Sequence, residues 1–236
     1  MIAPPLVVLY EDNHLLAVVK PPGLATMGLA GGEPTLLSLA KDYVKQRYHK
    51  PGNVYLGVVS RLDAPVTGVL LLARTSKAAR RLTEQFRSRT VKKTYWALVE
   101  GAVRPPAGDY VDWVRHDERH RRMHVARQGM DGVQEARLVY RTLRALEGIS
   151  LVEVELHTGR KHQIRLQFSA HGHPVVGDRK YGSGRPFSAG IALHARRLVV
   201  SHPTNGQPLE LVAPLPQAWN RLGVREGDLA RDGIVE

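Results

Sequence analysis

The sequence contains no cysteine among its 236 residues. Disulfide scaffolds, thiolate nucleophiles and zinc sites built on cysteine are therefore excluded. Any catalysis must use oxygen or nitrogen groups. A chain without disulfides is compatible with a reducing compartment, and we expect a cytoplasmic protein.

Long apolar runs and acidic residues are also scarce. No run approaches the ~18 residues of a membrane-spanning helix, and the first residues lack the basic and apolar regions of a signal peptide. Asp and Glu number 22 against 34 Lys and Arg, which gives a formal net charge of +12. This excess favours a polyanionic partner, with nucleic acid ahead of an anionic membrane surface.

The apolar content of 43% is enough for a sizeable core in one domain or two closely joined lobes. Hydrophobic patterning predicts many strands and few helices. Strands are expected in a hairpin within 6–19 and at 68–74, 92–100, 136–143, 149–157, 193–201 and 209–213, and helices at 35–49, 76–89 and 161–171. Thr35 and Ser76 are the expected N-caps of the first two helices. We therefore predict an α+β fold with a large mixed, mainly antiparallel sheet flanked by helices.

Three segments are expected to lie outside these elements. Residues 104–132 are bounded by Pro and Gly and very polar, which predicts a projecting loop or arm. Residues 28–32 form a glycine-rich loop without the spacing of a P-loop or a dinucleotide fingerprint. One domain is predicted over 6–222, followed by a polar, loose tail over 223–236.

The first candidate site is the turn that contains Asp63. Residues 58–68 end one apolar run and turn through Ala64-Pro65 into a buried strand. Such a turn can hold Arg61 and Asp63 beside a cleft. An isolated loop aspartate, however, more often shapes its own turn.

The second candidate site is the basic segment 157–165, with Thr158 or Gly159 near the N-cap of a helix where anions are favoured. Lys161 and Arg165 share a helix face, and the plainer interpretation is a solvated basic face. On the strand near 92–98, Tyr95 shares a face with Lys93. Tyr95 either packs or stacks on a base, a contact worth ~1–3 kcal/mol.

In their order along the chain, these segments resemble the RluA-type family of RNA pseudouridine synthases over about 6–219. The matching segments are Tyr10–Gly23, Arg61–Asp63 with 68–72, Lys93–Gly101, Thr158–Arg165, Gly172–Asp178 with Tyr181-Gly182, Leu193–Ala195 and His202-Pro203. The frequent N-terminal S4 module of the family is not expected, because the first motif begins near Tyr10.

The resemblance implies a catalytic Asp63, an active-site Tyr95 and an Arg165 that pairs with the aspartate, beside a central basic cleft. It implies isomerisation of a uridine in structured rRNA or tRNA by base flipping and exchange of a C–N for a C–C glycosidic bond. We expect no cofactor, no metal and a monomer. The residues expected to bind RNA are Arg61, Lys92, Lys93, Arg160, Lys161 and His162, joined by the 116–124 arm.

Two departures from the family pattern leave an alternative open. Ser60 stands where the family usually has histidine, and Val66 begins a Val-Thr-Gly segment where the family has Thr-Ser-Gly. The alternative is therefore an RNA-binding homologue with impaired catalysis. The intact Asp63, Tyr95 and Arg165 argue against it. A basic membrane-surface protein would need an amphipathic basic helix, and none stands out.

Overall fold

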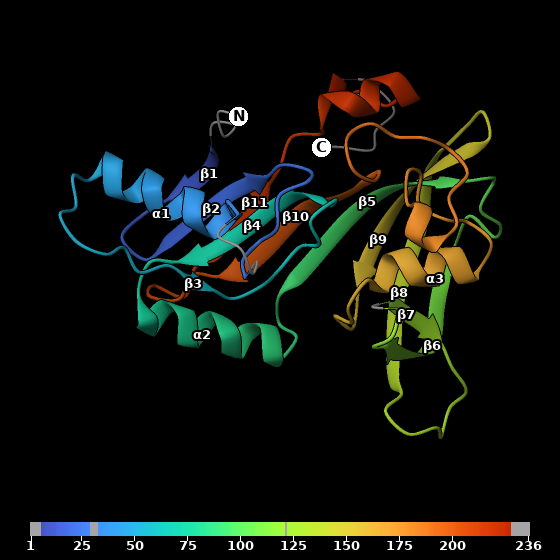
Figure 1. Ribbon diagram of the computed structural model, residues 1–236, viewed down its shortest axis with the longest axis horizontal. Coiled ribbons are helices and arrows are strands. Elements are labelled where there is room, and N and C mark those ends of the chain that lie inside the picture. Colours follow the sequence, from blue (N-terminus) through green and yellow to red (C-terminus); the bar gives the residue numbers. More distant parts are fainter. Residues whose placement is uncertain (1–5, 29–32, 121, 228–236) are drawn as a thin grey trace. The chain divides into compact units, whose positions relative to one another are not determined.

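The structure, a computed structural model, describes residues 6–28, 33–120 and 122–227 (Figure 1). The chain forms two compact units. The first combines Met1–Lys93 with Ala195–Pro214, and the second combines Thr94–His194 with Leu215–Glu236. The unit boundaries fall inside strands β5 (Lys92–Glu100) and β10 (Leu193–Ser201).

The first unit is a sheet with a helix on each face. Its strand order is β1 (Val7–Glu11), β2 (Leu15–Lys20), β4 (Thr67–Ala73) and β10, with β3 (Gly57–Val58) on β4 and β11 (Pro208–Val212) on β10. Helices α1 (Leu36–Arg47) and α2 (Ser76–Arg87) lie on opposite sides of this sheet (Figure 1).

Alternation along the strands explains why both helices find an apolar face. Leu16 and Leu70 pack in the cluster that contains α1, whereas Leu15 and Leu71 pack in the cluster that contains α2. Successive side chains of a strand point to opposite faces, so a strand covered on both sides reads as a continuous apolar run. This is why the run over β4 is apolar throughout.

The second unit is an antiparallel sheet in the order β5, β9 (Ile149–Leu156), β8 (Gln134–Leu146), β6 (Ala107–Asp117) and β7 (Arg122–Val125). Helix α3 (Gln163–Ala170) packs on one face through Phe168, whose ring lies 5.2 Å from Tyr110 and 5.7 Å from Tyr140. Two 3-10 helices, η1 (Arg179–Tyr181) and η2 (Gln217–Leu222), complete the unit.

The predicted α+β class and mainly antiparallel sheet are confirmed, but two helix starts differ from prediction. Thr35 caps α1 as expected. Helix α2 is capped by Thr75 rather than Ser76, because the Thr75 hydroxyl accepts the Ala78 N–H at 3.2 Å. Helix α3 begins after His162, so neither Thr158 nor Gly159 is its N-cap.

The prediction of a loop over 104–132 is wrong for most of that segment, because β6 and β7 form a hairpin there. Val114 and Met123 are buried, and the polar residues alternate with them. The many Arg and His residues of this segment hide that two-residue period in the sequence. We refer to Ala107–Val125 below as the β6–β7 hairpin.

Some predictions concern residues that lie largely outside the described part of the chain. These are the glycine-rich loop predicted over 28–32, of which 29–32 lie outside, and the tail predicted over 223–236, of which 228–236 lie outside. At the start of the tail, Val224 is buried in one cluster with Trp219. Among the described residues, no helix is long and apolar enough to span a membrane.

Candidate active site

The turn that carries Asp63 is held by a buried lysine at the end of β2. Lys20 is fully buried, and its ammonium donates to the carbonyl oxygens of Pro21, Leu24 and Ala64, each at 2.8 Å. Three donors meet three acceptors, which is the full capacity of an ammonium group. Lys20 therefore fastens the residue that follows Asp63 to the loop after β2.

A second set of bonds holds the other side of the turn. The Thr26 hydroxyl donates to the Leu62 carbonyl at 2.9 Å and accepts the Leu62 N–H at 3.2 Å. The Gly23 N–H donates to the Ala64 carbonyl at 2.8 Å. Both chain neighbours of Asp63 are thus fixed while its own side chain stays half-buried.

The charge of Lys20 is set by two opposing effects. Burial lowers the pKa of the Lys20 ammonium to about 7, and the negative charge of Asp63 acts in the opposite direction. The Asp63 carboxylate therefore stabilises a cation that burial destabilises. Sequence reasoning missed Lys20 as a site residue, because it entered only as part of the segment Tyr10–Gly23 that resembles the family, with no role of its own.

Gly68 lets β4 approach β10 directly after this turn. Its φ is +117°, and a Cβ there would lie 2.3 Å from the Ala195 carbonyl oxygen. Only glycine fits such a position. Val66, one of the two departures from the family pattern, is buried, so that change lies in the packing beneath the turn.

In the second unit, Tyr95 lies half-buried on the sheet face that α3 covers. It pairs with Val154 of β9, which pairs in turn with Tyr140 of β8. The Tyr140 ring contacts Phe168 of α3. Trp96 packs in a separate cluster, as the predicted alternation of the strand requires.

Arg165 is the buried cation of this unit, so the solvated basic face is wrong for this residue. It is 5% exposed and forms a two-pronged ion pair with Asp178, with Nε–Oδ2 at 2.6 Å and Nη2–Oδ1 at 2.9 Å. Its guanidinium also lies 5.1 Å from the centroid of the Tyr181 ring. Sequence reasoning gave Asp178 and Tyr181 no role, although both stand in segments that resemble the family.

The segment before α3 is organised by Gln163. Its side-chain oxygen accepts from the Thr158 hydroxyl at 2.8 Å and from the Arg160 N–H at 2.9 Å. The Arg160 Nε donates to the Glu135 carbonyl at 2.9 Å. Lys161 is exposed, and its ammonium lies 3.1 Å from His116 Nε2 on the hairpin.

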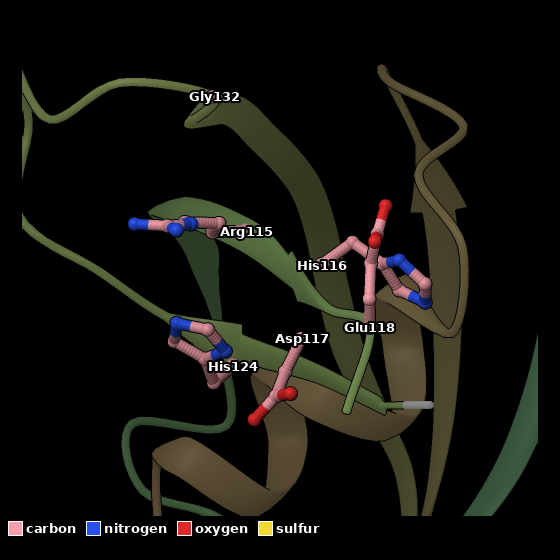
Figure 2. Close-up of a pocket in the computed structure, with 6 residues that line it drawn as sticks. All are labelled: Arg115, His116, Asp117, Glu118, His124 and Gly132. Carbon is pink, nitrogen blue, oxygen red and sulfur yellow. The ribbon is translucent and has the colours of Figure 1, made fainter. Parts of the chain in front are cut away.

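An open cavity of about 620 Å³ lies on the β6–β7 hairpin (Figure 2). Arg115 and His124, partners across the hairpin, extend to one side, and His116 and Glu118 lie on the other (Figure 2). Hydrogen bonds from the backbone and ring of His120 lower the pKa of Asp117 to about 2. The lining residues are Arg115, His116, Asp117, Glu118, His124 and Gly132.

The predicted site residues divide between the two units. Arg61, Asp63, Lys92 and Lys93 belong to the first, and the second contains Tyr95, Arg160, Lys161, His162 and Arg165. Arg61 and Lys92 are exposed. The pairing of Arg165 with Asp63, the approach of Tyr95 and the central cleft stay predictions. Among the described residues, no group of three His, Asp or Glu side chains can hold a metal ion.

The fold is that of known pseudouridine synthases. Human RNA Pseudouridylate Synthase Domain Containing 4 superimposes with a TM-score of 0.76 at 27% identity, covering 92% of this chain and 93% of the human one. Human RNA Pseudouridylate Synthase Domain Containing 1 gives 0.72 at 28% identity, covering 90% and 84%. This structural similarity places the protein in the class of RNA pseudouridine synthases, which are RNA-modifying isomerases.

Sequence comparison agrees. The sequence model of the RNA pseudouridylate synthase family matches residues 14–170 of this chain. Ribosomal large subunit pseudouridine synthase D of Nitrosomonas europaea is 37% identical over 228 residues, covering 90% of this chain and 62% of the relative. The uncharacterized RNA pseudouridine synthase YhcT of Bacillus subtilis is 34% identical, covering 91% and 70%. The chain belongs to the RNA pseudouridylate synthase family, which confirms the resemblance.

Proposed function

We propose that this protein converts a specific uridine of structured ribosomal RNA to pseudouridine, with Asp63 as its catalytic carboxylate. The observation that carries the proposal is the clamp on the Asp63 turn, in which Lys20 and Thr26 fix the residues on both sides. A carboxylate on a fixed backbone is preorganised for reaction. The name of the Nitrosomonas relative favours ribosomal RNA over transfer RNA.

The reaction needs few protein groups. The bond from ribose carbon 1′ to uracil N1 breaks, and a bond from the same carbon to uracil carbon 5 forms. Carbon 5 loses its proton, N1 gains one, and neither water nor electrons are consumed. Glycosidases need a second carboxyl group to protonate a departing oxygen or activate water. Here the base stays bound, so one carboxylate is sufficient and no cofactor is required.

The nucleotide must leave the RNA stack before the carboxylate can reach it. Flipping a base costs a few kcal/mol. Arg61, exposed beside the clamped turn, is suited to fill the vacated space. Tyr95 would stack on the flipped uracil, and Arg165 would pair with Asp63 and stabilise its charge.

The remaining predicted RNA contacts differ in exposure, because Lys92 and Lys161 are exposed whereas Lys93, Arg160 and His162 are half-buried. Lys161 and Arg160 precede α3, and Lys92 begins β5. The hairpin cavity adds Arg115 and His124 (Figure 2). These groups would bind phosphates without reading sequence.

The second candidate function is RNA binding with impaired catalysis, which Ser60 and Val66 favour as departures from the family pattern. Both functions predict RNA binding, so only turnover separates them. Val66 is buried, and its N–H donates to the Asp63 carbonyl at 3.0 Å, a backbone bond that does not depend on the Val66 side chain. This bond supports retained catalysis.

The test is deletion of the gene, followed by mapping of pseudouridines across cellular RNAs. We expect at least one ribosomal position to lose its pseudouridine, to regain it with the wild type and not to regain it with Asp63→Asn. This substitution keeps the shape and removes the charge, and we expect a loss of rate on the order of a thousandfold or more. An unchanged map after deletion would exclude pseudouridine formation in ribosomal RNA as the function of this protein. Turnover by Asp63→Asn would exclude Asp63 as the catalytic carboxylate.

A further inference from the structure

The Tyr181 hydroxyl lies where three elements of the second unit meet. Tyr181 ends η1 and is 3% exposed. Its hydroxyl oxygen accepts the Met123 N–H of β7 at 3.1 Å and shares a hydrogen bond of 2.8 Å with His162 Nδ1 at the start of α3. Burial raises the pKa of the Tyr181 phenol, so the group stays protonated at neutral pH.

The ring of the same residue lies against Arg165. The guanidinium carbon is 5.1 Å from the ring centroid, a distance at which a cation is attracted to an aromatic face. The Tyr181 N–H donates to the Asp178 carbonyl at 3.0 Å, and the Asp178 carboxylate binds Arg165. One short turn therefore places a carboxylate and a ring around one guanidinium.

The β6–β7 hairpin contacts this turn through two residues, one apolar and one cationic. Met123 packs in one apolar cluster with Tyr181 and with Leu166 of α3. Arg122 is exposed, and its guanidinium carbon lies 5.8 Å from the Tyr181 ring centroid. A residue available to RNA and the buried Arg165 thus both approach one ring.

We propose that Tyr181 is a positioning residue that couples RNA bound on the β6–β7 hairpin to the orientation of the Arg165 guanidinium. The proposal rests on the proposed function, because that function gives Arg165 its role beside the reacting nucleotide. Physically, the hydroxyl ties the ring to the hairpin backbone, and the ring face holds the guanidinium. A shift of β7 on RNA binding therefore moves a group in contact with Arg165.

The kinetic test uses Tyr181→Phe in the full chain, which keeps the ring and removes the hydroxyl. The substrate is in vitro transcribed ribosomal RNA with tritium at uridine carbon 5, and released tritium measures turnover. We expect kcat to fall about fivefold, because the hydrogen bonds to the Met123 N–H and to His162 are both lost, with KM unchanged. The matched control is Tyr140→Phe, which removes a hydroxyl that donates to the Pro105 carbonyl at 3.2 Å. The control should keep wild-type kcat.

Coupling to the hairpin is tested by adding Arg122→Gln in both backgrounds. We expect this substitution to lower kcat in the wild type and to have no further effect in Tyr181→Phe, since coupled sites are not additive. Additive losses, or a loss in Tyr181→Phe that appears only in KM, would overturn the proposal.

A measurement independent of turnover separates this proposal from the proposed function. The ¹⁵N signal of Arg165 Nε, assigned with Arg165→Lys, should shift when the ribosomal transcript binds the wild type, and less when it binds Tyr181→Phe. An unmoved signal in the wild type would overturn the coupling. Absence of turnover by the wild type with a moving signal would count against the proposed function alone.

Discussion

Each unit buries a cation beside a predicted active-site element, and these two cations, Lys20 and Arg165, are held differently. In the first unit the Lys20 ammonium donates to three backbone carbonyls from two loops. In the second unit the Arg165 guanidinium is held by the carboxylate of Asp178. The lysine organises a backbone, and the arginine is itself the group being held in place.

The chemistry of the two side chains explains the difference. An ammonium is compact and can direct its three N–H groups to separate acceptors, whereas the flat guanidinium fork matches a carboxylate with two parallel bonds. A lysine pKa also falls readily on burial, but an arginine keeps its charge. The comparison therefore predicts that the two cations respond differently to loss of a partner and to pH.

The largest effect on stability is expected for Asp178→Asn, which removes the carboxylate charge of the buried, two-pronged ion pair with Arg165. Removing one partner of a buried ion pair costs about 3–5 kcal/mol. Urea unfolding measures the free energy of unfolding. The control is Asp109→Asn, whose exposed carboxylate lies 3.8 Å from Arg137, and this change should cost less than about 1 kcal/mol. Equal losses in the free energy of unfolding from the two variants would show that the buried ion pair contributes no more to stability than the exposed one.

A somewhat smaller effect is expected for Lys20→Met, which leaves the carbonyls of Pro21, Leu24 and Ala64 without this donor. Unsatisfied buried polar groups cost about 1–3 kcal/mol each, but the Ala64 carbonyl keeps the Gly23 N–H as a donor, so we expect about 2–3 kcal/mol in total. Turnover should fall as well, because the Asp63 turn loosens. Lys77→Met, at an exposed site on α2, is the control. An unchanged free energy of unfolding in Lys20→Met would contradict the clamp.

The same variant gives a pH dependence with a defined sign. Burial lowers the folded-state pKa of Lys20 to about 7, whereas an unfolded lysine titrates near about 10.4. Between these values the unfolded chain binds more protons, so the Lys20 contribution to stability rises with pH. The destabilisation by Lys20→Met should therefore be greater at pH 9.5 than at pH 6.5. The opposite trend would show that Lys20 is not desolvated in this way.

The smallest effect on stability is expected for a cation at the surface. Such a residue tests whether exposed cations contribute to RNA binding rather than to the free energy of unfolding, in contrast to the buried ones. Lys161→Gln should leave the free energy of unfolding within about 0.5 kcal/mol. It should reduce the slope of log affinity for RNA against log salt by about 1, the effect of one lost phosphate contact. Binding titrations over a range of salt concentrations measure this slope, and Lys161→Arg should restore it. If the slope of the variant equals that of the wild type, Lys161 makes no phosphate contact with the RNA.

Local patterns predicted much of the fold because their physical causes are local. The strand Lys92–Glu100 has the predicted bounds, since polar residues at its start lead into a continuous apolar and aromatic run over Tyr95–Val99. Thr35 caps α1 as predicted, because its hydroxyl accepts the N–H three residues later. The β6–β7 hairpin was missed because charged residues masked a weak alternation.

The site was predicted less completely, for a different reason. Asp63 and Arg165 stood out through the family resemblance, but the partners that fix their surroundings lie far from them along the chain. Lys20 reaches a carbonyl 44 residues away, and Asp178 lies 13 residues beyond Arg165. No periodicity or local spacing marks such a pair.

The sequence by itself determined the family, the basic character and the positions of most strands and helices, because composition and short-range periodicity are properties of neighbouring residues. Only the tertiary structure decided that Lys20 clamps the Asp63 turn and that Asp178 and Tyr181 surround Arg165. The desolvation that makes a buried charge select its partners exists only after distant segments have packed together.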